Sequence, residues 1–209
     1  SSVSAGAQNT ASGTFSGVSG GAINKASGLL SNIGGGVANT ASGRQSFVIG
    51  GANNIASGNI SSVFGGSSNQ ATGVGASVSG GTNNSARAIG ATVSGGQHNS
   101  AVGRYSSVNS GTNNLANGIF SSVSGGSNNT ATGEYSSVGG GNTNVSTSIN
   151  QHMPSSRLAP YVTINPSAFN NLNGPNIVFT GANIHVRSGG GTSGTEENGL
   201  GNFIVGANQ

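Results

Sequence analysis

The chain has 209 residues, of which 40 are glycine, 4% are charged and 5% are aromatic, with no cysteine and no tryptophan. This composition excludes an ordinary core of large side chains, disulfide bridges and thiolate metal sites, and no apolar run is long enough to span a bilayer. The net charge is +3, but a nucleic-acid-binding surface needs basic residues gathered in a patch. Here they are scattered singly, at Lys25, Arg44, Arg87, Arg104, Arg157 and Arg187.

A repeat of fifteen residues runs from Val3 to about His152 without insertion or deletion. Its clearest copy, residues 123–137, reads VSGGSNNTATGEYSS. We number the repeat from 0 at the valine, which is replaced by isoleucine only at Ile33. A unit this short cannot hold a helix pair or a propeller blade, so it predicts an all-β solenoid, a parallel β-roll of ten stacked coils over residues 1–152. At the ~4.8 Å spacing of paired strands, the rod would be about 48 Å long.

Each coil is expected to contribute two short strands and two turns. One strand surrounds the valine, from two residues before it to position +1, and the other spans positions +6 to +10. Side chains alternate along a strand, so the valine, the serine at +13, the glycine at +2, the asparagine at +6, the alanine at +8 and the glycine at +10 should face inward. Only a narrow roll fits side chains this small.

Glycine at +3 and asparagine at +6 recur in all ten copies, as in Gly6, Gly21, Gly81 and Gly126 and in Asn9, Asn24, Asn84 and Asn129. Glycine supplies a positive φ without steric cost. Asparagine either adopts a left-handed turn conformation or bonds the turn backbone, and stacked copies would form an amide ladder. We interpret both as structural turn residues rather than as a ladder that binds a ligand.

Position +12 carries the larger side chains, and its parity points it outward: Phe15, Leu30, Ile60, Tyr105, Phe120 and Tyr135. An exposed apolar column indicates an interface. Phe15, Tyr105, Phe120 and Tyr135 are therefore candidate contact residues between subunits, and an adhesive stripe for another molecule is the alternative.

The sequence changes character after the repeats. All four prolines lie between residues 153 and 175, which predicts an irregular linker. Residues 176–209 are expected to return to β structure, with strands in NIVFTG and ANIHVRSG. The chain ends in FIVGANQ, which is similar to the opening of a coil. Ile204, Val205 and Asn208 are therefore candidate end-to-end contacts, either because the chain is a fragment or because copies form a head-to-tail polymer.

The sequence offers little for catalysis. There is no aspartate and there are only three glutamates, so paired-carboxylate and Ser-His-Asp sites are not expected. His98, His152 and His185 lack metal-ligand spacing. No enzyme activity, metal or cofactor is predicted. Ice binding needs a regular hydroxyl face, and the outward pair at +7 and +9 is interrupted by Lys25, Arg87 and Leu115.

The repeat resembles the head repeats of trimeric autotransporter adhesins, the YadA-like heads. The likeness covers Val3 to His152 and rests on Ser-Val-Ser-Gly-Gly, as in residues 77–81, and on Ala-x-Gly, as in residues 131–133. It departs from the family at the core strand, where Val-Ser-Gly-Gly replaces Val-Ala-Ile-Gly. The resemblance implies a left-handed roll and a trimer, and the family's collagen binding cannot be assigned to any residue here. Related coils also occur in phage tail fibres and repetitive surface proteins.

Together these observations predict an extracellular or cell-surface structural and adhesive protein: a rod-like stalk, head or filament subunit that associates with copies of itself, with three copies most consistent with the resemblance. The alternatives are a module that binds a surface glycan, a host matrix protein or ice through an outer ladder of side chains, and a phage tail-fibre segment. No nucleic acid and no membrane-spanning segment are expected within the chain.

Overall fold

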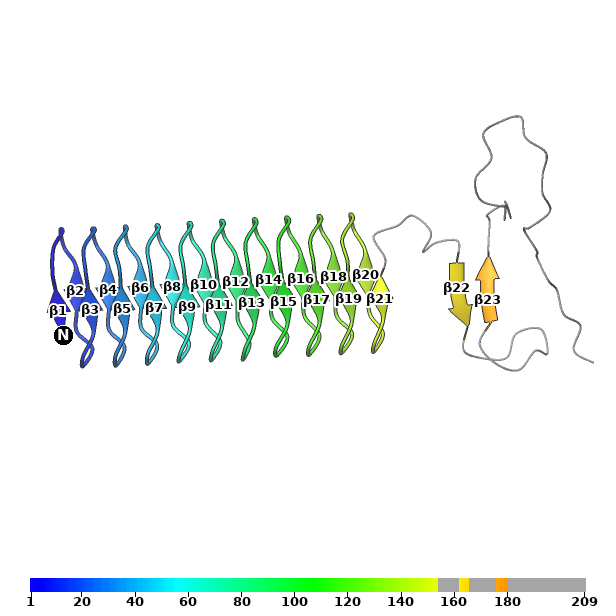
Figure 1. Ribbon diagram of the computed structural model, residues 1–209, viewed down its shortest axis with the longest axis horizontal. Coiled ribbons are helices and arrows are strands. Elements are labelled where there is room, and N and C mark those ends of the chain that lie inside the picture. The colour runs from blue at the N-terminus through cyan, green and yellow to red at the C-terminus, as the bar shows by residue number, and fades with distance from the viewer. Residues whose placement is uncertain (154–161, 166–175, 180–209) are drawn as a thin grey trace, which may run out of the picture. The chain divides into compact units, whose positions relative to one another are not determined.

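The computed structural model describes residues 1–153, 162–165 and 176–179, and every regular element in this part is a β-strand. The chain divides into two units, Ser1–Ser156 and Arg157–Gln209. The first unit is a straight row of closely similar coils (Figure 1). The predicted β-solenoid of about ten coils is therefore confirmed, and His152–Met153 opens an eleventh coil.

One long side of the roll is an 11-stranded parallel sheet that contains the valine column, here called the valine sheet. Neighbouring strands pair in a register of fifteen residues, so Ser77 lies beside Thr92 and Val78 beside Val93. Its strands are β1 (Ser2–Val3), β3 (Gly17–Val18), β5 (Asn32–Ile33), β7 (Phe47–Val48), β9 (Ser62–Val63), β11 (Ser77–Val78), β13 (Thr92–Val93), β15 (Ser107–Val108), β17 (Ser122–Val123), β19 (Ser137–Val138) and β21 (His152–Met153).

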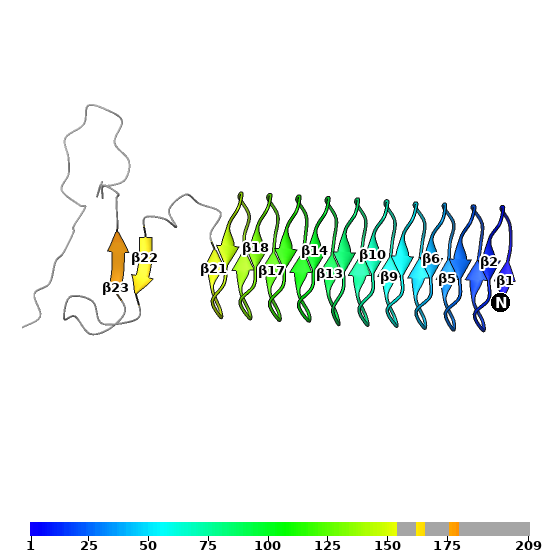
Figure 2. The ribbon, with the colours of Figure 1, turned by 180° about the vertical axis from the view of Figure 1, so that it is seen from behind.

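The other long side is a 10-stranded parallel sheet with the alanine column, here called the alanine sheet. It can be followed in the view from behind (Figure 2). Its strands are β2 (Thr10–Ala11), β4 (Lys25–Ala26), β6 (Thr40–Ala41), β8 (Ile55–Ala56), β10 (Gln70–Ala71), β12 (Ser85–Ala86), β14 (Ser100–Ala101), β16 (Leu115–Ala116), β18 (Thr130–Ala131) and β20 (Val145–Ser146). All strands in both sheets are two residues long, which is shorter than the sequence predicted.

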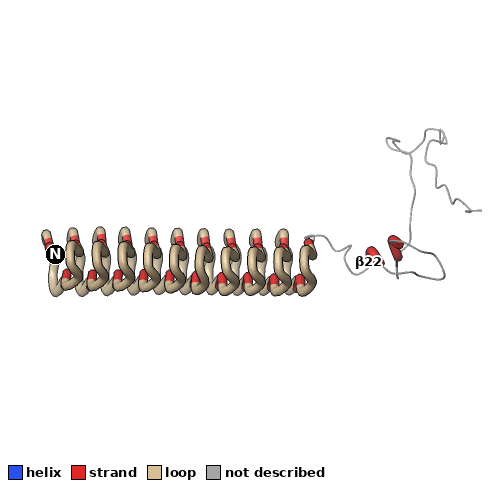
Figure 3. Tube along the Cα trace, turned by 90° about the horizontal axis from the view of Figure 1, so that it is seen from below, coloured by secondary structure: helices blue, strands red, loops and turns tan. Residues whose placement is uncertain are grey.

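A third hydrogen-bonded ladder joins the coils at position +4, where isolated parallel bridges connect residues such as Ser67 and Thr82. This ladder was not predicted, because position +4 lies between two turn residues and carries no constant side chain. In the tube trace, the coils stack in a straight row with strands at equivalent places in successive coils (Figure 3).

The interior holds the small residues that the parity argument placed there. Val78 and Ala86 are fully buried, and so are Asn84 and the serine at +13, for example Ser61. The glycine at +10 is also buried, as at Gly73. Most coils thus place one valine and one alanine in the interior with a polar Asn and Ser, while Ile33 replaces the valine in one coil and Ala76 and Ala91 replace the serine in two. Apolar burial per coil is small, and the roll depends strongly on backbone hydrogen bonds between coils.

One predicted interior position is wrong. The glycine at +2 is only half-buried in most coils, and a Cβ atom added there meets open space, as at Gly20, Gly65 and Gly80. The strand ends at the valine, as β11 does at Val78, so side-chain alternation does not extend to +2. The carbonyl of this glycine accepts a hydrogen bond from the asparagine at +6, as Gly80 does from Asn84 Nδ2 at 2.8 Å.

The two turns of each coil contain left-handed residues. Glycine at +3 has a positive φ, as predicted, and in Gly81 it is +85°. A Cβ at Gly81 would lie 2.1 Å from the carbonyl oxygen of Gly96, so only glycine fits. Positions +5 and +12 are also left-handed, and most of their residues are not glycine. The asparagine at +6 does not itself adopt this conformation.

The asparagines at +6 instead form a continuous ladder along the rod. The Asn84 side chain donates from Nδ2 to the carbonyls of Gly80 and Gly96, at 2.8 and 2.9 Å. Its Oδ1 accepts the backbone N–H of Asn99 at 2.9 Å. The predicted ladder is therefore present, but in the central coils it runs from side chain to backbone rather than from amide to amide.

In the second unit, β22 (Val162–Asn165) pairs antiparallel with β23 (Asn176–Phe179). The strand predicted in NIVFTG is present over its first four residues. β22 lies inside residues 153–175, which were expected to be irregular. The prolines on either side of the short run Val-Thr-Ile-Asn led to that expectation. The strand predicted in ANIHVRSG lies outside the described residues.

Candidate functional site

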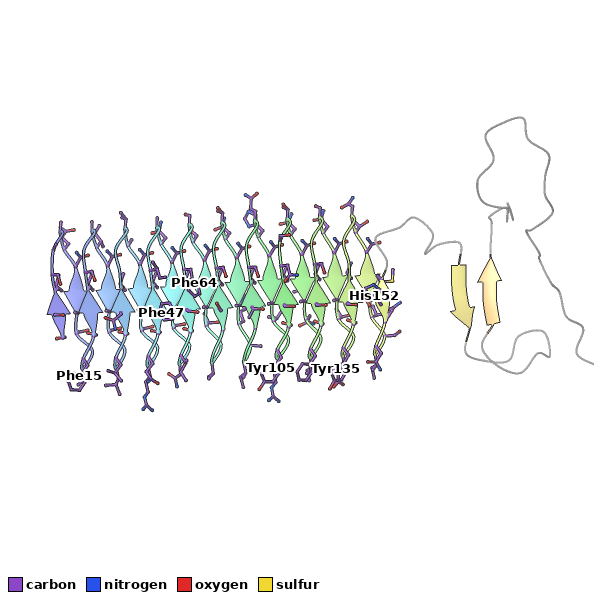
Figure 4. The ribbon with its side chains drawn as sticks, in the orientation of Figure 1. Phe15, Phe47, Phe64, Tyr105, Tyr135 and His152 are labelled. Carbon is purple, nitrogen blue, oxygen red and sulfur yellow. The ribbon has the colours of Figure 1, made fainter. Side chains whose placement is uncertain are left out.

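The most prominent surface feature of the roll is one turn edge, formed by positions +11 and +12 of every coil and here called the apolar edge. Phe15, Tyr105 and Tyr135 lie along it in Figure 4. Most of the exposed large hydrophobic residues in the described chain gather on this edge: Phe15, Leu29, Leu30, Ile60, Val74, Ile89, Tyr105, Ile119, Phe120, Tyr135 and Ile149. A row of apolar side chains this long on the surface of the roll indicates a contact surface.

Three aromatic rings form a continuous stack on the edge. The Phe120 ring lies between those of Tyr105 and Tyr135, with both centroid separations 5.1 Å and interplanar angles of 13° and 3°. The Arg104 guanidinium lies 5.8 Å from the Tyr105 ring centroid. At Gly90 an added Cβ would lie 2.5 Å from the Tyr105 ring, so the ring covers this glycine. The coil spacing thus places the three predicted contact residues side by side, while Phe15 stands several coils away.

The backbone at +12 is strained. Every non-glycine residue there has φ between +54° and +58°, including Phe15, Ile60 and Phe120. This conformation costs roughly 1–2 kcal/mol for residues other than glycine. Gly75 and Gly90 occupy the same position with φ of +65° and +64°, so the turn accepts glycine. Large apolar side chains at a strained, exposed position suggest a role outside the fold of the single chain.

Ring stacking determines what chemistry the edge can offer. Both faces of the Phe120 ring lie against its two neighbours, so this ring presents only its edge to solvent. A sugar ring or another flat ligand that stacks on an aromatic face would find these faces occupied. The exposed surface is therefore suited to packing against other apolar side chains.

A second apolar patch was not anticipated from the sequence. Phe47, Ile49 and Phe64 are exposed on the outer face of the valine sheet, and the rings of Phe47 and Phe64 meet edge to face at 5.5 Å (Figure 4). The surrounding positions are mostly serine, threonine or asparagine. The sequence contained enough information to predict this patch, because these residues flank the inward valine column and must point outward.

The recurrent turn residues are structural. Asn24, Asn84 and Asn129 are buried, and their amides are engaged with backbone groups. Asn9 makes similar bonds at the end of the roll. The glycines at +3, represented by Gly6, Gly21, Gly81 and Gly126, all have positive φ. Neither set presents free polar groups for a ligand.

The two described histidines, His98 and His152, lie in different coils. His98 occupies a left-handed turn position with φ of +56°. His152 is on β21 and forms a hydrogen bond through Nδ1 with Ser137 Oγ, on an exposed sheet face. Among the described residues no three His, Cys, Asp or Glu side chains group together as metal ligands. His185 lies outside the described residues.

The outer face of the alanine sheet mixes hydroxyl, charged and apolar side chains. Lys25 lies on β4, Leu115 lies on β16, and Arg87 donates from Nε to Ser85 Oγ at 2.9 Å. These residues break any regular array of hydroxyl groups. The end-to-end contact residues Ile204, Val205 and Asn208 lie outside the described residues.

Over residues 1–153, 162–165 and 176–179, no helix has the length and hydropathy that a membrane crossing requires. No protein-family model and no curated protein matches this chain.

Proposed function

We propose that this chain is an extracellular structural and adhesive rod, a stalk, head or filament subunit, that assembles by contact between copies of itself. The observation that carries the proposal is the apolar edge, with its stacked Tyr105, Phe120 and Tyr135. The roll buries only small side chains, so association would add apolar burial that the single chain lacks. The extracellular location and a trimer are what the resemblance to adhesin heads implies.

Three features support a structural role over the binding of a small ligand. The coils stack in one register from Val3 to Met153, which favours a stiff, extended shape. The asparagine amides that recur in every coil are engaged within the roll. On the apolar edge, both faces of the Phe120 ring and one face each of Tyr105 and Tyr135 are occupied by neighbouring rings. Glycan, matrix-protein and ice binding therefore rank below self-association, and no observation on the roll favours a second function.

Electron microscopy of the purified chain tests the proposal. We expect stiff particles in which two or more rods lie side by side, each about 48 Å long over its ten coils. The variant Tyr105→Ser/Phe120→Ser/Tyr135→Ser should give single rods of the same length. Separate single rods from the unchanged chain at micromolar concentration would contradict the proposal. A glycan array run with both proteins completes the test, since binding that survives in the single-rod variant would favour a ligand-binding module.

A further inference from the structure

The apolar edge carries an internal symmetry between its sixth and tenth coils. Along position +11 the residues are Ile89, Arg104, Ile119, Glu134 and Ile149, which read the same in both directions except that the two charges are opposite. Along position +12 the aromatic rings of Tyr105 and Tyr135 stand symmetrically about Phe120. All of these side chains are exposed.

The backbone keeps this pattern on a straight line. Each of these coils pairs with the next in the same register of fifteen residues, and the two ring separations are equal at 5.1 Å. Arg104 and Glu134 are two coils apart, about 9.6 Å at the strand spacing. The edge is therefore a regular column in which Ile119 and Phe120 mark the centre.

We infer that this edge binds the same edge of a second copy of the chain in antiparallel orientation, around a two-fold axis at the coil of Ile119 and Phe120. Such an interface is self-complementary, because each residue meets its symmetry mate. Arg104 of each rod then faces Glu134 of the other, Tyr105 faces Tyr135, and Ile89 faces Ile149. The inference rests on the self-association proposed above and defines its geometry.

Charge decides between the two orientations. In a parallel pair residues of the same number meet, so Arg104 would face Arg104 and Glu134 would face Glu134, which is destabilising. The antiparallel pair converts both contacts into opposite-charge pairs. Only one other antiparallel register sets Glu134 against an arginine on this edge, Arg44, and that register leaves Arg104 opposite Val74.

The antiparallel contact joins two rods over about five coils. It leaves the first coils of each rod unpaired, so the pair is longer than one rod. A parallel trimer would have to use another surface of the roll, such as the patch of Phe47, Ile49 and Phe64 on the valine sheet.

Charge reversal tests the inference on the purified chain. Arg104→Glu alone and Glu134→Arg alone each turn two attractive contacts into repulsive ones, and we expect association measured by sedimentation at low salt to weaken at least about fivefold. The double variant Arg104→Glu/Glu134→Arg restores opposite charges and should associate like the unchanged chain. Unchanged association in both single variants, or no recovery in the double variant, would overturn the antiparallel contact.

Distances between spin labels give an independent test, helped by the absence of native cysteine. Labels at Arg44→Cys and at Thr14→Cys lie on the same edge, five and seven coils from the proposed axis. In the antiparallel pair the label-to-label distances should be about 48 Å and about 67 Å. A single short distance, equal for both labels, would show a parallel assembly, so the inference would fail while self-association stands. A monomeric chain would contradict both the antiparallel contact and the self-association proposed above.

Discussion

The side-chain Oδ1 of Asn69 accepts a hydrogen bond from the backbone N–H of Asn84, one coil further along the rod, at 3.0 Å. The same side chain donates from Nδ2 to the carbonyls of Gly65 and Gly81, both at 2.9 Å. One amide therefore closes the turn of its own coil and also fixes the next coil. Because Asn69 is fully buried, no water replaces these bonds when the amide is removed.

Asn69→Ala should lower the free energy of unfolding by about 3 kcal/mol, because the Asn84 N–H and the carbonyls of Gly65 and Gly81 lose their side-chain partner. Thermal and denaturant unfolding followed by circular dichroism measure the change. The matched control is Gln70→Ala, an exposed side chain on the adjacent residue, which should change the stability by less than about 0.5 kcal/mol. Equal effects of the two substitutions would contradict the structural role of the ladder.

The serines at position +13 should behave in the opposite way. Ser61, Ser121 and four others at this position have buried hydroxyls without a hydrogen-bond partner, while Ala76 and Ala91 occupy the same place in two coils. Ser121→Ala should therefore leave the unfolding free energy unchanged or raise it by up to about 1 kcal/mol. A loss above about 1 kcal/mol would show that the hydroxyl takes part in the core.

The strain at position +12 predicts a stabilising substitution. Ile60 is β-branched, 61% exposed and has φ of +58°, whereas Gly75 occupies the same position one coil later. Ile60→Gly should raise the unfolding midpoint, because relief of about 1 kcal/mol of backbone strain exceeds the small loss of packing at an exposed site. The unfolding midpoint of Ile60→Gly, compared with the unchanged chain, measures this, and a lower midpoint would contradict it.

Gly81→Ala provides the contrasting substitution at the other turn. Its Cβ would lie 2.1 Å from the Gly96 carbonyl oxygen and 2.6 Å from Asn84 Nδ2. Both atoms belong to the stack, and neither can move without breaking it. We expect a loss of several kcal/mol and early unfolding of the coils around it, visible as faster amide hydrogen exchange near residues 81–96.

The sequence predicted the solenoid and most of its interior, because residues fifteen positions apart occupy equivalent places in successive coils. Val78, Ala86 and Asn84 recur at fixed positions, so side-chain parity alone placed them inside. The turn conformations were harder to predict. The left-handed residues at +5 and +12 include isoleucine, histidine and phenylalanine, which local propensity would not place there, and only the stacking of coils holds them in that conformation.

Of the two positions that form the apolar edge, the sequence analysis predicted only +12. Position +12 was assigned outward, and the stack of Tyr105, Phe120 and Tyr135 follows from it. The contribution of position +11, with Ile89 and Ile119, was missed. Two neighbouring residues on a strand point to opposite faces, but these two lie in a turn, where the bend places both on the outside.

The central claim is that the chain associates with itself through the apolar edge. Light scattering after size-exclusion chromatography measures the mass of the particle directly. We expect the unchanged chain to have the mass of two or more copies and the variant Tyr105→Ser/Phe120→Ser/Tyr135→Ser to have the mass of one, with the circular dichroism spectra alike. A single-chain mass for the unchanged protein at micromolar concentration, or an assembly that the triple variant leaves intact, would contradict the claim.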